Sequence, residues 1–199
     1  MAGTDGSDKK ARQHAGRLRN EQARQDVLGS ALELAAETAS RGFTMEELAA
    51  RAAVSKRTLY RWWSCRSEVL AEALVERALT VVDTPATNDA AADLRSYIRS
   101  VYRQAHAPQV AAALRLLMAD AQTNPTAATA LHTFTTHRRD TCLKLLSRAQ
   151  EHDALSTERD PGVMTDVILG TVWYRLLTAE PITDDTVADE IIHLLIREA

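Results

Sequence analysis

The sequence predicts an all-α fold, and three observations support that prediction. Apolar residues recur at helical spacing along most of the chain, and no segment shows the two-residue alternation of a half-buried strand. The 199 residues include only seven Gly and five Pro, too few for a turn-rich β-sandwich. The chain is 45% hydrophobic, which is enough for a substantial core, yet no run of about 18 apolar residues predicts a membrane span.

The N-terminal part is expected to hold a basic arm and a first helix. Residues 1–20 contain five Lys and Arg but no apolar periodicity, so we expect a flexible arm. Apolar residues with helical spacing then predict a helix over residues 21–41. Gly42 is expected to end this helix, because glycine readily adopts the left-handed backbone of a C-terminal cap.

Two short helices and a turn are predicted next. Thr44 and Glu47 form a capping box, in which each side chain satisfies a backbone donor of the other residue. After a tight turn, Ser55 caps a second short helix, and a longer helix follows from Arg66 to about Val82. Residues 21–66 thus predict a helix-turn-helix domain, whose second short helix has the size that fits the DNA major groove.

The remaining residues, 67–199, predict a helical body that brings the total to about nine helices. Asn124-Pro125 and Asp160-Pro161 each resemble an N-terminal cap followed by proline at the first helical position. The segments Val163–Leu177 and Ile191–Ile196 are apolar on nearly all sides, so the helices that contain them, expected at about 161–178 and 184–197, should be buried on two sides. A second copy of the chain is a plausible cover for one side, which predicts a homodimer.

The net charge of −3 is unevenly distributed. Residues 1–67 hold twelve Lys and Arg against eight Asp and Glu, a charge of +4, whereas residues 68–199 carry −7. A basic end attached to an acidic body indicates that one end meets a polyanion. Chance clustering of charges on solvated helices explains the same asymmetry equally well.

Residues 43–70 contain a motif made of Ala49, Ala52, Val54, Ser55, Thr58, Leu59, Tyr60, Trp63 and Arg66. With these residues the segment resembles the tetracycline-repressor-like (TetR) family of transcription regulators. Leu169 to Leu177 is also similar to a helix of one subgroup of that family. The resemblance implies a head of three short helices that binds DNA and a body, residues 67–199, that binds an effector and dimerises.

The DNA-contacting residues are expected around the second short helix. Lys and Arg reach phosphates and guanine, while Thr and Tyr hydroxyls bind phosphates and fix the register. Trp62 either packs on the following helix or flanks the DNA backbone, and Ala53 stands where the family usually has Gly. Partly from the residues and partly from the resemblance, the predicted contacts are Thr44, Ser55, Lys56, Arg57, Thr58, Tyr60, Arg61, Trp62 and Arg66.

The body is expected to hold an apolar effector cavity and a dimer seam. Arg138 interrupts an apolar stripe, so it either joins an internal or inter-subunit ion pair or recognises an anionic or carbonyl-bearing ligand. The predicted pocket residues are Tyr97, Tyr102, Met118, Phe134, Arg138, Trp173 and Tyr174. The predicted seam residues are Val167, Gly170, Tyr174, Leu177, Ile191 and Leu195.

No constellation of residues predicts catalysis, a cofactor or a metal. The six His do not cluster, Cys65 and Cys142 stand far apart, and no phosphate-binding glycine loop or nucleophile motif occurs. The sequence therefore predicts a cytoplasmic, non-enzymatic transcription regulator, most simply a repressor, that binds a palindromic double-stranded DNA operator as a dimer and is released by a small molecule. The alternative is a helical protein that binds a small molecule or acyl chain and no DNA.

Overall fold

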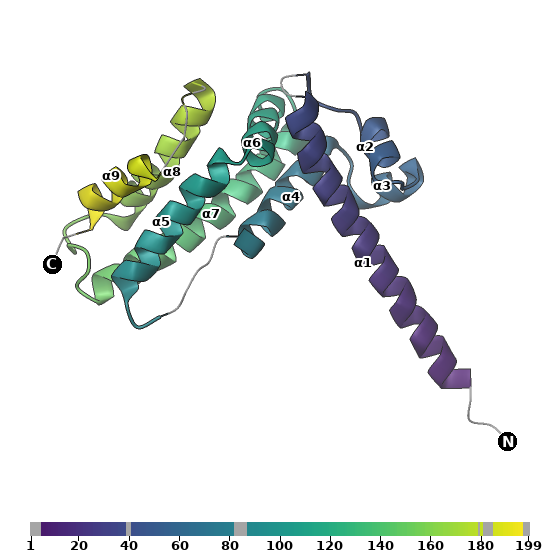
Figure 1. The fold of residues 1–199 in the computed structure, drawn as a ribbon, viewed down its shortest axis with the longest axis horizontal. Helices are drawn as coiled ribbons and strands as arrows, with labels where there is room; N and C mark the ends of the chain where they lie inside the picture. Colours follow the sequence, from purple (N-terminus) through teal and green to yellow (C-terminus); the bar gives the residue numbers. More distant parts are fainter. Residues whose placement is uncertain (1–4, 39–40, 82–86, 179, 181–184, 197–199) are drawn as a thin grey trace.

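The computed structural model describes residues 5–38, 41–81, 87–178, 180 and 185–196, and within these ranges the chain is helical without strands. Helices α2 and α3 lie at one end of the molecule, and α8 and α9 lie at the other (Figure 1). The helices are α1 (Asp5–Thr38), α2 (Met45–Arg51), α3 (Lys56–Trp62), α4 (Arg66–Val81), α5 (Ala90–His106), α6 (Pro108–Ala121), α7 (Pro125–Glu151), α8 (Pro161–Thr178) and α9 (Thr186–Leu195).

Helix α1 corrects two expectations for the N-terminal part. Residues 5–20 do not form a separate arm, because they continue the helix that was predicted to begin at residue 21. The head therefore consists of one long and two short helices rather than three short ones. The N-terminal half of α1 projects away from the other helices (Figure 1). Residues 1–4 of the predicted arm lie outside the described ranges.

The helix-turn-helix forms as its capping residues predict. The Thr44 hydroxyl accepts a hydrogen bond from the Glu47 amide, and the Glu47 carboxylate accepts one from the Thr44 amide at 2.7 Å. Ser55 caps α3 by accepting from the Thr58 amide at 3.0 Å. Between the two helices Ala53 has a φ of +53°, the left-handed conformation that the family's usual glycine adopts without strain.

Proline starts three of the body helices. Pro108, Pro125 and Pro161 are the first residues of α6, α7 and α8. Asn124 accepts hydrogen bonds from two amides of α7, as predicted for a capped N-terminus. Asp160 does the same for the amides of Gly162 and Val163 in α8.

A single apolar core joins the head to the body. Helix α4 is central, because it packs against α1 on the head side and against α6 and α7 on the body side. The largest side chains that are fully buried in the body are Tyr97 and Tyr102. No helix within the described ranges is long and apolar enough to cross a membrane.

The left-handed backbone at Ala53 leads to a prediction about stability. An alanine in the left-handed region is strained by about 1–2 kcal/mol, part of which is offset because glycine is more flexible in the unfolded chain. Ala53→Gly should therefore raise the free energy of unfolding by up to about 1 kcal/mol. Urea denaturation followed by circular dichroism measures this.

Ala52→Gly is the matched control, because Ala52 has an ordinary φ of −83° at the end of α2. It should lower the free energy of unfolding by about 0.5–1 kcal/mol. If both substitutions lowered stability equally, the strain at Ala53 would be refuted.

Candidate nucleic-acid interface and effector cavity

Helix α3 has one buried side and one exposed, basic side. Leu59 is completely buried and packs into the same core as Leu48 of α2. Lys56, Arg57 and Arg61 are exposed, and the Tyr60 side chain is 50% exposed. This arrangement follows from helical periodicity, because residues adjacent to a buried position turn outward. The exposed face offers cations and one phenol hydroxyl, the groups that bind DNA phosphates and guanine.

Several polar groups beside this face already have partners. The Thr44 and Ser55 hydroxyls take part in the two N-terminal caps, and the Ser55 hydroxyl also lies 2.8 Å from that of Thr58. Lys56 forms an exposed ion pair with Glu46 at 3.2 Å. The ion pairs of the described residues do not include Arg57 or Arg61, so these cations need not break an ion pair to bind phosphate.

The two adjacent tryptophans have different environments. Trp63 is buried, and its indole N–H donates to the Glu72 carboxylate of α4 at 3.0 Å. Trp62 is half-buried against the core, with its ring at an edge-to-face angle to Trp63 and the Arg61 guanidinium 5.8 Å from its ring centre. Of the two alternatives for Trp62, the packing role is therefore observed, while a contact with the DNA backbone stays a prediction.

Arg66 has internal partners in this structure. Its guanidinium donates to both carboxylate oxygens of Asp120 on α6, at 2.8 and 2.6 Å, and to the Phe43 carbonyl at 2.9 Å. Ser67 donates to the same carboxylate at 2.8 Å. In this conformation Arg66 joins the start of α4 to the end of α6, and its contact with a DNA phosphate stays a prediction.

Gly42 leaves the space that this guanidinium fills. Its φ is +70°, and a Cβ atom placed on it would lie 2.6 Å from Nη1 of Arg66. Burial alone would raise the pKa of Asp120, but the hydrogen bonds from Arg66 and Ser67 bring that pKa below its ordinary value. The hydrogen bond to Asp120 correspondingly raises the pKa of Arg66. The pair is therefore ionised across the neutral range.

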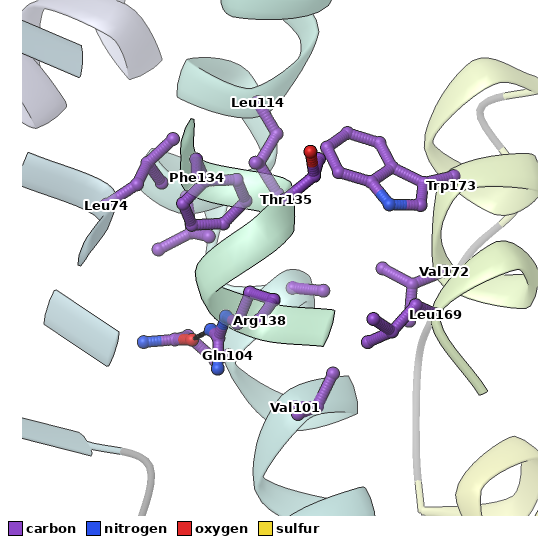
Figure 2. Close-up of a pocket in the computed structure, with 12 residues that line it drawn as sticks. Leu74, Val101, Gln104, Leu114, Phe134, Thr135, Arg138, Leu169, Val172 and Trp173 are labelled. Carbon is purple, nitrogen blue, oxygen red and sulfur yellow. Dashed lines mark hydrogen bonds between the residues drawn. The ribbon is translucent and has the colours of Figure 1, made fainter. Parts of the chain in front are cut away.

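A small cavity of about 50 Å³ lies in the body between α4, α5, α6, α7 and α8. Its walls are mostly apolar, and Phe134 and Trp173 meet edge to face with ring centres 6.5 Å apart. Figure 2 shows Leu74 and Phe134 on one side and Leu169, Val172 and Trp173 facing them from α8. Arg138 and Gln104 lie together, joined by a hydrogen bond from the guanidinium to the amide oxygen (Figure 2).

The structure brings only part of the predicted pocket together. Phe134, Arg138 and Trp173 line the cavity. Tyr97 and Tyr102 are core residues instead, because their hydroxyls donate to the backbone carbonyls of Arg138 and Ile168. Met118 lines a different, more open hollow, and Tyr174 is 64% exposed, so neither lines this cavity. Gln104 and Leu74 are lining residues that sequence reasoning missed.

Comparison with protein families now assigns this architecture. Residues 27–73 match the model of bacterial regulatory proteins of the tetR family, and residues 84–195 match the tetracyclin repressor-like C-terminal domain. The second match alone covers more than half of the chain. This chain belongs to the TetR family. It is accordingly a helix-turn-helix transcription regulator of a ligand-responsive class.

Relatives of similar length support the assignment to the TetR family. The uncharacterised HTH-type regulator YdeS of Bacillus subtilis is 28% identical over 184 residues, which are 92% of this chain and 91% of YdeS. The TetR-family regulator SCO0332 superposes with a TM-score of 0.69 at 26% identity, covering 86% of this chain and 94% of its own. FadR from Bacillus subtilis, in complex with stearoyl-CoA, superposes with a TM-score of 0.68 at 16% identity, covering 85% of this chain and 95% of FadR. This likeness shows the shared fold.

The TetR match to residues 27–73 extends beyond the end of the head predicted at residue 66, because α4 belongs to the head and the body alike.

Within the described ranges, no three His, Cys, Asp or Glu side chains gather as a metal site. Cys142 is buried, and burial raises the pKa of its thiol to about 11. Cys142 is therefore a thiol rather than a reactive thiolate at neutral pH.

The contact between Arg66 and Asp120 makes a second prediction. Asp120→Asn removes the charge that pairs with a partly buried guanidinium, so the free energy of unfolding should fall by about 1–3 kcal/mol at pH 7. Because the pKa of Asp120 is lowered in the folded protein, its contribution is present above the unfolded pKa of about 4 and is lost as the pH falls through the folded value. The difference between parent and variant should therefore shrink under acid conditions, as measured by denaturation at several pH values.

Asp166→Asn is the control, because Asp166 pairs with Arg139 on an exposed surface. Exposed ion pairs contribute less than about 1 kcal/mol, so this variant should stay close to the parent. Equal losses in both variants would contradict a special role for Asp120.

Proposed function

We propose that the chain is a homodimeric repressor that binds a palindromic operator through α3 and leaves it when a small molecule occupies the body cavity. The observation that supports DNA binding best is the exposed face of α3, on which Lys56, Arg57, Tyr60 and Arg61 surround the buried Leu59. Paired heads of a dimer enter successive major grooves of a two-fold-symmetric site. We also propose that the protein acts in the cytoplasm, where its operator DNA lies. We assign the chain no catalytic role.

An exposed apolar stripe on α8 supports the homodimer. Val163, Val167, Gly170, Tyr174 and Leu177 are spaced by alternating steps of four and three residues, which aligns them along one helix face. The Val163, Val167, Tyr174 and Leu177 side chains are 39–71% exposed, and a Cβ atom on Gly170 would meet nothing within 4 Å. A second copy that presents the same stripe across a two-fold axis covers this surface and forms a four-helix arrangement with α9.

The predicted seam on α9 needs a correction. Ile191 and Leu195 are buried within the chain itself, each 7% exposed, because they face α5 and the body core. Leu194, which is 62% exposed, is the apolar side chain that α9 offers to a partner. The proposed seam therefore contains the α8 stripe and Leu194.

The cavity supports a ligand-controlled response because helix α4 forms one of its walls. Leu74 lines the cavity two turns after Arg66, which holds the head end of the same helix. A ligand releases DNA only by binding more tightly to the conformation in which the heads do not match the operator. The related FadR fold with stearoyl-CoA supports an apolar effector for such a body.

DNA binding is tested with an operator selected in vitro from random duplex DNA. Arg57→Ala should weaken binding and reduce the slope of log affinity against log salt concentration by about one, because one phosphate contact is lost. Tyr60→Ala should weaken binding by at least several-fold. Fluorescence anisotropy at several salt concentrations measures both effects.

Arg103→Ala is the matched control, because Arg103 is an exposed cation on α5 of the body. It should leave the affinity and the salt slope unchanged. Parent-like binding by the Arg57 and Tyr60 variants would show that α3 is not the docking face. Failure to select any duplex would favour the alternative, a helical protein that binds small molecules without DNA.

The dimer seam is tested with Leu177→Glu. Leu177 is 71% exposed in one chain, so a charge there should leave the protomer folded but place an unpaired carboxylate in the seam. Analytical ultracentrifugation should show the dimer dissociation constant rising at least 100-fold. Thr136→Glu, on an exposed position of α7, should leave the dimer intact, and a dimeric Leu177→Glu would refute the seam.

A further inference from the structure

The body cavity contains a partly buried cation, Arg138, for which the described residues supply no anionic partner. Arg138 lies among Phe134, Gln104 and Tyr97, and the ion pairs of the described residues do not include it. Burial lowers the pKa of this guanidinium, and Tyr97 offsets part of that effect. An arginine nevertheless stays protonated in proteins. The internal ion pair that was one of the two explanations for Arg138 is therefore not observed.

Gln104 adds a second unsatisfied group at the same place. It is 5% exposed, and its amide oxygen accepts from Arg138. Its amide nitrogen is buried and has no hydrogen-bond partner among the described residues. Native proteins rarely leave a buried donor without a partner, so this amide marks a place where a bound ligand could supply an acceptor.

The polar end of the cavity has more donors than acceptors. The guanidinium carries five N–H donors and the amide carries two, whereas the acceptors beside them are the Gln104 oxygen and the Tyr97 hydroxyl, both neutral. The Thr135 hydroxyl, another lining group, already donates to the His132 carbonyl. What is missing is a group with two acceptor oxygens and one negative charge.

The rest of the cavity favours an apolar ligand. Its walls are formed by aliphatic side chains together with Phe134 and Trp173, and its volume is about 50 Å³, so a longer ligand must displace some of these side chains to enter. The single guanidinium matches a single negative charge. A ligand with several phosphates would bring charges for which the lining residues offer no further cation.

We propose that the effector is a monocarboxylic acid with an apolar body, bound with its carboxylate between Arg138 and Gln104 and its apolar part against Phe134 and Trp173. A carboxylate accepts two parallel hydrogen bonds from a guanidinium, and its remaining lone pairs satisfy the Gln104 amide. This inference rests on the proposed role of the cavity as the effector site. It assigns the chemical class of the effector, a free acid rather than its neutral alcohol or ester.

The experiment compares pairs of probes that differ in charge. Decanoate and 4-phenylbutyrate are titrated into the purified dimer by calorimetry, alongside 1-decanol and 4-phenyl-1-butanol. The parent should bind at least one carboxylate saturably and at least ten-fold more tightly than the matching alcohol. Arg138→Met should abolish this difference by weakening only the carboxylate.

Gln104→Glu is the second variant, because it keeps the volume of the side chain and places an internal carboxylate beside Arg138. It should weaken carboxylate binding at least ten-fold and raise the melting temperature, since the partly buried cation gains a partner. This variant also tests the proposal if Arg138→Met does not fold. Equal affinity for acid and alcohol, unchanged carboxylate affinity in either variant, or no saturable binding of either acid would overturn the proposal.

Operator binding by the same preparations separates this proposal from the proposed function. Loss of carboxylate binding with intact operator binding overturns only the assigned ligand class. Absence of operator binding in the parent protein overturns the regulatory function, whatever the calorimetry shows.

Discussion

The paired hydrogen bonds between Arg66 and Asp120 are the contact on which the arrangement of the molecule depends. They join the first residue of α4 to the last turn of α6 at 2.6–2.8 Å, and they also reach the backbone at Phe43, just before α2. Head, shared helix and body therefore meet at one side chain. Gly42 suits this geometry, because its φ is +70° and a Cβ atom there would force the guanidinium to shift. The glycine that was expected to end the first helix lies four residues after the end of α1 and makes room for the junction.

The head could be predicted closely because its signals are local. The capping box of α2, the Ser55 cap of α3 and the burial of Leu59 between exposed neighbours each involve residues within one turn of one another, so sequence spacing determines them. Ala53 could be recognised as unusual only from the family resemblance, in which glycine occupies this turn, and its φ is +53°. The N-terminal extension of α1 was missed because residues 5–20 lack an apolar face, and apolar periodicity was the signal used.

The body could be predicted as helices but not as a site. Which side of an apolar helix faces the core, the cavity or a partner depends on contacts between residues distant in sequence, such as Asp120 with Arg66. Tyr97 and Tyr102 were assigned to the pocket because they are aromatic, yet their hydroxyls satisfy backbone carbonyls inside the core. Ile191 and Leu195 were assigned to the seam because Ile191–Ile196 is apolar on nearly all sides, yet Leu194 is the exposed residue of this segment.

In the proposed mechanism, helix α4 links ligand binding in the body to DNA binding by the head, because it is short, stiff and held at one end. Leu74 lies eight residues after Arg66, about 12 Å along the helix axis. Over that length a helix moves as a rigid element, so a ligand that displaces Leu74 must either tilt α4 about the Arg66 junction or break the junction. Both movements change how the head sits on the body, and the spacing of two heads in a dimer changes with it. Arg138 lines the same cavity, and among the described residues its guanidinium has no anionic partner and the Gln104 amide nitrogen has no acceptor, so a bound carboxylate would satisfy both. The free energy released there is available to move α4 only to the extent that the ligand prefers the moved conformation.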